Sequence, residues 1–165
     1  MEKLNLTYKR AQAWSIDLII ASIIFTVSII AFYVYTMNST SETKEEMENM
    51  FYDGKLIGDA LLSEGYPQNW TSDNVITIGI TSGEKVDEAK LENFYALSVS
   101  DYNKTKSIFN TKYNYYFVLN GSISVNGGSV DGIGEAPLDP ANLIKITRLT
   151  VYKDKPTTAY LYIWE

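Results

Sequence analysis

One long apolar stretch near the N-terminus constrains this chain more than any other feature. Residues 16–36 read IDLIIASIIFTVSIIAFYVYT, and Asp17 is their only charged residue. A helix of about 20 apolar residues crosses a hydrocarbon core roughly 30 Å thick. The alternative is a buried helix of a soluble domain, but such helices rarely run so long without a polar face. We therefore expect a membrane-spanning helix.

The charges on either side of this stretch predict its orientation. Lys3, Lys9 and Arg10 precede it, whereas residues 41–49, SETKEEMEN, hold four glutamates and one lysine. Basic flanks favour the cytoplasmic side, so the part after the span is expected outside the membrane. Of the 14 basic and 20 acidic residues, three and two lie before Met37, which leaves 11 and 18 beyond it. Such an acidic surface does not favour nucleic acid as a partner.

Composition limits the chemistry of the external part. Roughly 125 residues follow the span, enough for one domain with a proper core. The chain has no Cys and no His. Disulfides, thiol chemistry, the commonest general base and the commonest transition-metal ligands are therefore excluded. We expect no enzyme and no cofactor; an anchored hydrolase that uses carboxylates is the least favoured alternative.

The region after the span predicts a second, amphipathic helix over residues 43–64, into which the first can extend. Gly65 and Pro67 are expected to end it. Gly54 and Gly58 would let another helix or a sheet approach closely, and packing on the domain's own sheet is favoured over a partner. The apolar residues that recur at intervals of three and four are Met47, Met50, Phe51, Ile57 and Leu61.

Beyond Pro67 the pattern predicts short strands and two short helices. We expect a strand over residues 75–80, a helix over residues 87–97, and a helix over residues 101–109 with Ser100 as N-cap. Strands over residues 113–119 and 122–125 flank Asn120–Gly121, the dipeptide best suited to a type I′ hairpin turn.

The C-terminal third predicts a long loop and two more strands. Residues 126–142 are rich in Gly and Pro, and we expect an exposed excursion there. Strands are expected over residues 143–152 and 157–164. The fold class is therefore α+β: a long N-terminal hydrophobic helix extends into an amphipathic helix, and a C-terminal antiparallel β-sheet domain with two short helices follows.

The residues before the span carry a resemblance to a known family. The chain reads KRAQAWSIDLII over residues 9–20, a short basic leader that runs straight into the apolar helix. This resembles the processing site of archaeal type IV pilin-like proteins of the class III signal peptide type. Lys9, Arg10 and Ala11 match the end of the leader, and Gln12 matches the first residue of the mature chain.

The resemblance implies an organisation and two kinds of partner. It implies a leader over residues 1–11, a span or filament-core helix over 12–37, a helical stem over 38–66 and an extracellular sheet domain over 67–165. A prepilin peptidase would remove the leader, and copies would then associate through the N-terminal helix.

Asp17 departs from the family pattern by one position. The family usually carries its acidic residue at the fifth mature position, whereas Asp17 is sixth if cleavage follows Ala11 and fifth if it follows Gln12. The resemblance implies a role in assembly, because a carboxylate in hydrocarbon needs a charged partner. The alternative is a carboxylate near the membrane interface, favoured by the helix dipole.

Four sequons after the span predict N-glycosylation of a surface protein. Each has Asn two residues before Ser or Thr with no intervening Pro. They begin at Asn38, Asn69, Asn103 and Asn120.

Two further features leave two interpretations open. Asp131, Glu135 and Asp139 could hold a calcium ion, although a solvated acidic loop is favoured. The aromatic residues of 113–117 could form a platform for a carbohydrate or protein, although core packing is favoured.

The leading hypothesis is a structural subunit of an archaeal type IV pilus-like surface filament. The alternative is a single-span envelope protein that stays in the membrane, with an external domain that binds a partner or ligand.

Overall fold

The computed structural model describes the backbone of residues 2–165 and the side chains of residues 16–37 and 44–165. The chain divides into two compact units, one ending at Glu45 and one spanning Glu46–Glu165. Helix α1 covers Glu2–Leu61, so the two expected N-terminal helices are one continuous helix. The fold is α+β, as expected.

The second unit contains two more helices and eight strands. Helices α2 and α3 cover Glu88–Ser100 and Tyr102–Phe109. The strands are β1 Thr81–Ser82, β2 Lys85–Val86, β3 Asn114–Leu119, β4 Ile123–Val125, β5 Gly128–Val130, β6 Ile133–Gly134, β7 Leu143–Tyr152 and β8 Lys155–Trp164.

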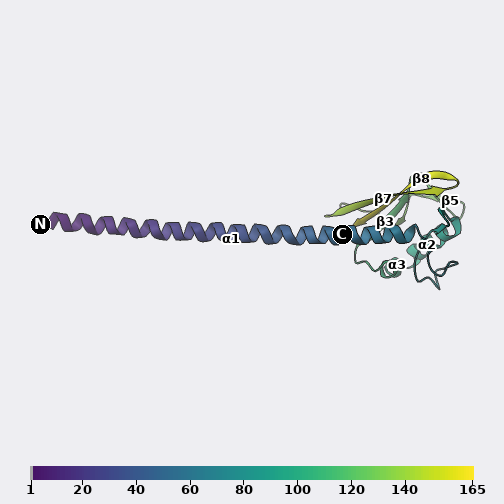
Figure 1. The fold of residues 1–165 in the computed structure, drawn as a ribbon, viewed down its shortest axis with the longest axis horizontal. Coiled ribbons are helices and arrows are strands. Elements are labelled where there is room, and N and C mark those ends of the chain that lie inside the picture. Colours follow the sequence, from purple (N-terminus) through teal and green to yellow (C-terminus); the bar gives the residue numbers. More distant parts are fainter. Residues whose placement is uncertain (1) are drawn as a thin grey trace. The chain divides into compact units, whose positions relative to one another are not determined.

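A six-stranded sheet forms the framework of this unit, with the strand order β1-β2-β7-β8-β3-β6. Every neighbouring pair is antiparallel except β2 and β7, which meet in parallel at Lys85 and Val151. β4 and β5 form a separate two-stranded sheet. Figure 1 shows β7, β8 and β3 beside the C-terminal end of α1.

The C-terminal end of α1 packs on one face of the sheet. Of its predicted apolar residues, Met50, Ile57 and Leu61 are fully buried, whereas Met47 and Phe51 are 43% and 55% exposed. A Cβ atom at Gly54 would lie 3.1 Å from Cγ1 of both Ile146 and Ile163, so the glycine permits this close approach. The prediction that these small residues pack on the domain's own sheet is therefore confirmed for Gly54.

Helices α2 and α3 cover the part of the same face formed by β3. Phe94 of α2 stacks on Tyr115 with ring centroids 6.1 Å apart, and Phe109 of α3 meets Tyr115 edge-on at 5.3 Å. The helix predicted over residues 87–97 is confirmed, with Asp87 as its N-cap. The N-cap of α3 is Asp101 rather than Ser100, because the Asp101 carboxylate accepts the N–H of Lys104.

The expected strand over residues 75–80 is wrong. Ile78 and Ile80 are fully buried, but the backbone forms only an isolated antiparallel bridge, between Thr77 and Tyr66, and a bond to the end of α1. Ile76 N and Thr77 N donate to Tyr66 O, and Ile80 N donates to Leu61 O. Ile78 and Ile80 are therefore core residues without a place in the sheet, and Ile76 is 65% exposed.

The hairpin expected at Asn120–Gly121 is also wrong. β3 pairs with β8 and β6, whereas β4 pairs with β5. A two-residue turn with both φ angles positive lies instead at Asn126–Gly127, at 50° and 77°, and joins β4 to β5. The expected exposed excursion over residues 126–142 is therefore partly ordered into β5 and β6, and its Ile133 is buried.

Several boundaries differ from the sequence-based expectation, and the C-terminal end of α1 and the start of β8 have a clear cause. α1 ends at Leu61 rather than at residue 64, because Ser63 N and Oγ both donate to Ala60 O and close a tighter turn. Gly65, with φ of 71°, lies in the following turn. β7 has the expected bounds, while β8 begins at Lys155, two residues early, because Lys153 and Asp154 form a two-residue turn with positive φ.

Candidate membrane-spanning and assembly site

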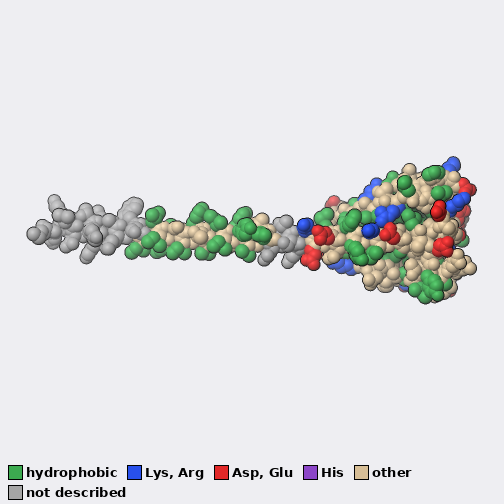
Figure 2. All heavy atoms as spheres, in the orientation of Figure 1, with side chains coloured by type: hydrophobic (Ala, Val, Ile, Leu, Met, Phe, Trp, Pro, Cys, Tyr) green, Lys and Arg blue, Asp and Glu red, His purple; other side chains and the backbone are tan. Residues whose placement is uncertain are grey.

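The apolar stretch forms a helical segment long and apolar enough to cross a membrane. The segment Ile16–Met37 has 22 residues and a mean hydropathy of 2.4, and none of its most apolar window is buried. Length and composition fit both a membrane span and a signal sequence near the N-terminus. In Figure 2, apolar side chains line the described span, whereas most of the visible charged side chains lie on the unit that carries the sheet.

Three hydroxyl groups of the span are satisfied within the helix. Thr26, Ser28 and Thr36 each donate to the carbonyl oxygen four residues earlier, at 2.8, 2.8 and 2.9 Å. A polar group in hydrocarbon is costly unless it has a hydrogen-bond partner. These three side chains are therefore compatible with lipid or with a dry helix–helix contact.

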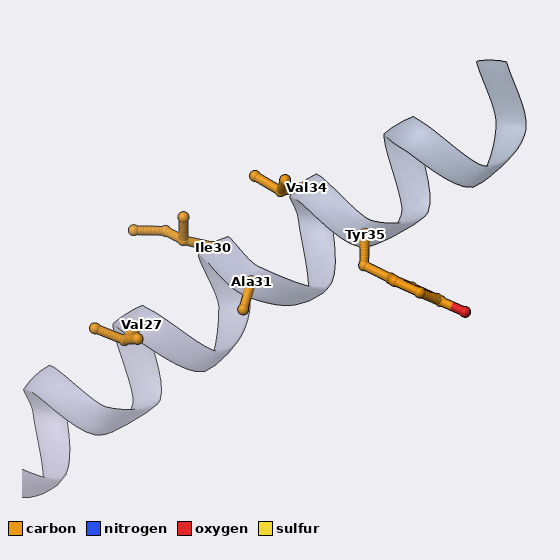
Figure 3. A pocket seen from close by; sticks show the side chains of 5 residues that line it. All are labelled: Val27, Ile30, Ala31, Val34 and Tyr35. Atoms are coloured by element: carbon orange, nitrogen blue, oxygen red, sulfur yellow. The ribbon is translucent and has the colours of Figure 1, made fainter. Parts of the chain in front are cut away.

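One face of the span is hollowed over a small residue. Val27, Ile30, Ala31, Val34 and Tyr35 line a shallow concavity. In Figure 3 Val27, Ile30 and Val34 extend to one side and Tyr35 to the other, with the short Ala31 between them. Small residues flanked by larger ones let a second helix approach closely.

The expected assembly and processing residues differ in how far they are described. Asp17 lies in the first turns of the span with an exposed side chain. Lys9, Arg10, Ala11 and Gln12 fall within α1, but their side chains lie outside the described residues. Their suggested roles in leader processing therefore remain predictions.

Three of the four predicted glycosylation sites are described, and all three are exposed. Asn69 and Asn120 lie outside helices and strands, whereas Asn103 lies in α3. The Thr105 hydroxyl of that last sequon is buried and donates to Tyr102 O at 2.6 Å. The side chain of Asn38 lies outside the described residues.

The structure also describes the two remaining candidate sites, the aromatic residues of 113–117 and the acidic residues of the loop. Tyr113, Tyr115 and Phe117 are buried, so these aromatic residues pack in the core as favoured. Burial also raises the pKa of Tyr115 to about 12. Asp131, Glu135 and Asp139 have exposed side chains, and no group of three acidic residues placed to hold a metal occurs among the described residues.

Lys90 is a buried polar feature that the sequence analysis missed. Its side chain is 6% exposed, and Nζ donates to Glu64 O and Thr81 O, both at 2.8 Å. These bonds join α2 to the segment after α1 and to β1. Its only signal in the sequence is its position: Lys90 directly precedes Leu91, which is buried on the apolar side of α2.

Comparisons of this chain with protein-family models, with curated proteins and with solved structures found no match.

Proposed function

We propose that this chain is a structural subunit of a surface filament of the archaeal type IV pilin-like kind. The observation that carries the proposal is α1: one continuous helix whose first part has an uncovered span and whose last turns pack on an antiparallel sheet. A subunit of this kind needs an N-terminal helix that suits lipid before assembly and neighbouring helices afterwards.

The precursor would be held in the membrane with its basic leader inside and its sheet domain outside. A prepilin peptidase would cut near Ala11, which leaves Gln12 at or near the new N-terminus. Copies would then pack through their spans, and the concave face around Ala31 is a suitable contact. Asp17 would pair with the new amino terminus of an adjacent copy, because an unpaired carboxylate in a dry helix bundle costs a few kcal/mol, roughly.

N-terminal mass spectrometry of the protein recovered from its own cells tests the proposal. The expected result is a mature chain that lacks the first 11 or 12 residues. A mature protein with an intact leader would contradict the proposal and favour the permanently anchored envelope protein.

Asp17→Asn tests the assembly role separately from processing. The expected result is normal membrane insertion with loss of filaments under electron microscopy. Asp53→Asn is the matched control, because Asp53 is an α1 carboxylate of the sheet unit and its substitution leaves the span unchanged. Unchanged filaments in the Asp17→Asn strain would show that Asp17 has no part in assembly.

A further inference from the structure

The six-stranded sheet has one face turned away from α1, here called the outer face. In β8, Ala159, Leu161 and Ile163 are buried on the side where α1 packs. Side chains alternate between the two faces of a strand, so the even-numbered residues of β8 lie on the outer face, and among them are Tyr160 and Tyr162.

The outer face is apolar and aromatic and carries one charge on its three long strands. Among the outward residues of β3, β7 and β8, all of which the structure describes, only Lys145 is charged. Its Nζ lies 3.9 Å from the centre of the Tyr160 ring and 5.4 Å from that of Tyr162. The amine therefore places a hydrogen-bond donor among these rings.

The outer face is open toward β7. On the side of β6, Gly132 lies against the ring of Tyr116 and borders the face there. On the side of β7, Leu149 is 83% exposed and lies opposite Thr158 of β8. A contiguous apolar and aromatic surface of this kind is often an interaction site.

Asn120 lies at the border of this open part. β3 pairs with β8 as far as Leu119, and Asn120 N then donates to Thr158 O at 2.8 Å, so the pairing continues for one more residue. Alternation along the strand places Asn120 on the outer face with Val118. Tyr160 is its diagonal neighbour on β8, and the Cα atoms of such neighbours are about 7–8 Å apart.

Asn120 is also the acceptor of one of the four sequons, and both Asn120 and Ser122 are exposed. A sugar linked to its side-chain nitrogen therefore begins at the outer face. The C–H groups on one side of a pyranose ring are attracted to the negative face of an aromatic ring. Its hydroxyl oxygens accept hydrogen bonds from an amine, so rings with an adjacent lysine suit a glycan.

We propose that the glycan on Asn120 folds back over the outer face of its own chain. It covers Tyr160 and the exposed Leu149, and its hydroxyl groups accept hydrogen bonds from Lys145. The covalent link favours this occupant over a free glycan or a second copy, because it holds the sugar beside the face at a high effective concentration. The inference requires a glycan at Asn120 and is independent of leader removal and of filament assembly.

Tyrosine nitration of the full-length protein in detergent, purified from its own cells, tests the contact. Ser122→Ala removes the glycan and keeps Asn120 in place, and peptide mass spectrometry measures the nitration of each tyrosine. Tyr160 is expected to react several-fold faster in the variant than in the wild type. Tyr52 of α1 is 62% exposed and lies outside the outer face, so it is the internal control and should react equally in both.

Three results of this experiment overturn the proposal. The first is a wild-type protein without a glycan on Asn120. The second is a Tyr160 that reacts rapidly in both proteins, which means that the face stays open. The third is a Tyr160 that is protected in both, which means that something other than this glycan covers the face.

A double-mutant cycle on melting temperature gives an independent test. Ser122→Ala is expected to lower the melting temperature by a few degrees in the wild-type background and by much less in the Tyr160→Leu background, where the ring is absent. Tyr66→Leu is the control background, because Tyr66 is 63% exposed outside the outer face, and there the full loss should remain. An equal loss in all three backgrounds contradicts a contact with Tyr160.

The experiment also separates this inference from the proposed function. N-terminal mass spectrometry of the same protein reports leader removal. An intact leader with glycan-dependent protection of Tyr160 refutes the filament subunit and keeps the glycan contact, whereas a removed leader without such protection does the reverse.

Discussion

At the residue scale, Lys90 is the one charged residue buried among the described side chains. Replacing it by Met removes two hydrogen bonds and leaves the carbonyl oxygens of Glu64 and Thr81 without this donor. A buried group left without its partner costs about 1–3 kcal/mol. We therefore expect Lys90→Met to lower the free energy of unfolding by about 2 kcal/mol or more.

Thermal and denaturant unfolding of the full-length chain in detergent, followed by tryptophan fluorescence, measures this change. Lys155→Met, at an exposed position at the start of β8, is the matched control and should change stability by less than about 0.5 kcal/mol. Equal effects of the two substitutions would show that the buried amine contributes little.

The sequons differ in how their residues are held. Asn120 is exposed and is followed by Gly121 and an exposed Ser122, whereas Asn103 lies in α3 with Thr105 buried and hydrogen-bonded. A transferase that acts on the folded domain can reach a loop more easily than a helix. We expect a glycan at Asn120 and none at Asn103. Glycopeptide mass spectrometry checks this, and Asn120→Gln should remove one glycan mass; occupancy of Asn103 equal to that of Asn120 would contradict it.

At the element scale, the start of α2 depends on one carboxylate. Asp87 accepts hydrogen bonds from Ala89 N, Lys90 N and Ser82 Oγ. Burial raises the pKa of this carboxyl, but these bonds outweigh burial and hold it below the ordinary value of 3.8. A folded-state pKa below that of the unfolded chain stabilises the fold at higher pH and ceases to do so as the pH falls through the folded-state value.

Asp87→Asn should therefore change the pH dependence of stability. We expect the difference in melting temperature between the wild type and the variant to be constant above about pH 5. It should shrink as the pH falls below the ordinary pKa of the carboxyl, 3.8. Melting temperatures from pH 3 to 7 measure it. Asp73→Asn serves as the control, because Asp73 lies in an exposed turn. A wild-type advantage that stays constant down to pH 3 would contradict the role of the ionised carboxylate.

The contact of α1 with the sheet predicts opposite changes in stability for substitutions at Gly54 and Gly58 of α1. A Cβ at Gly58 would lie 3.5 Å from Ile146, an ordinary contact, so Gly58→Ala should gain up to about 1 kcal/mol of helix propensity. A Cβ at Gly54 would lie 3.1 Å from both Ile146 and Ile163, so Gly54→Leu should lose about 1–3 kcal/mol by overpacking. Denaturant unfolding of the full-length variants compares them, and stabilisation by both would refute the close approach at Gly54.

The sequence predicted elements well where local pattern decides the structure. The bounds of β7 match the prediction, and periodicity predicted both α2 and α3, although α2 continues to Ser100 and α3 is capped by Asp101 rather than by Ser100. It failed where distant partners decide: Asn120–Gly121 and Asn126–Gly127 have the same local preference for a turn, but β3 pairs with β8, about 40 residues later. Nor could spacing show that the amine of Lys90 reaches the carbonyl oxygens of Glu64 and Thr81.

At the scale of the whole molecule, the boundary at Glu45 predicts an independently folding part. Residues 46–165 contain the entire sheet, α2, α3 and the buried residues described for α1. Glu46, the first residue of this unit, forms a 2.7 Å ion pair with Lys112. A chain that begins at Lys44 lacks the span, but it keeps the core residues Met50, Ile57 and Leu61. We expect it to be soluble without detergent and to unfold cooperatively, because its core is intact.

Near-ultraviolet circular dichroism of this fragment should match that of the full-length chain in detergent, since Trp70 and the aromatic cluster around Tyr115 belong to the fragment. Vesicle flotation should recover the full-length chain with lipid and leave the fragment behind, because the segment Ile16–Met37 is the only described helix long and apolar enough to span. A fragment beginning at Gly58, which removes Met50 and Ile57 from the core, is the matched control and should fail to fold. If the longer fragment also failed to fold, the sheet unit would depend on the span for its stability, and the membrane helix would be part of the folding unit as well as its anchor.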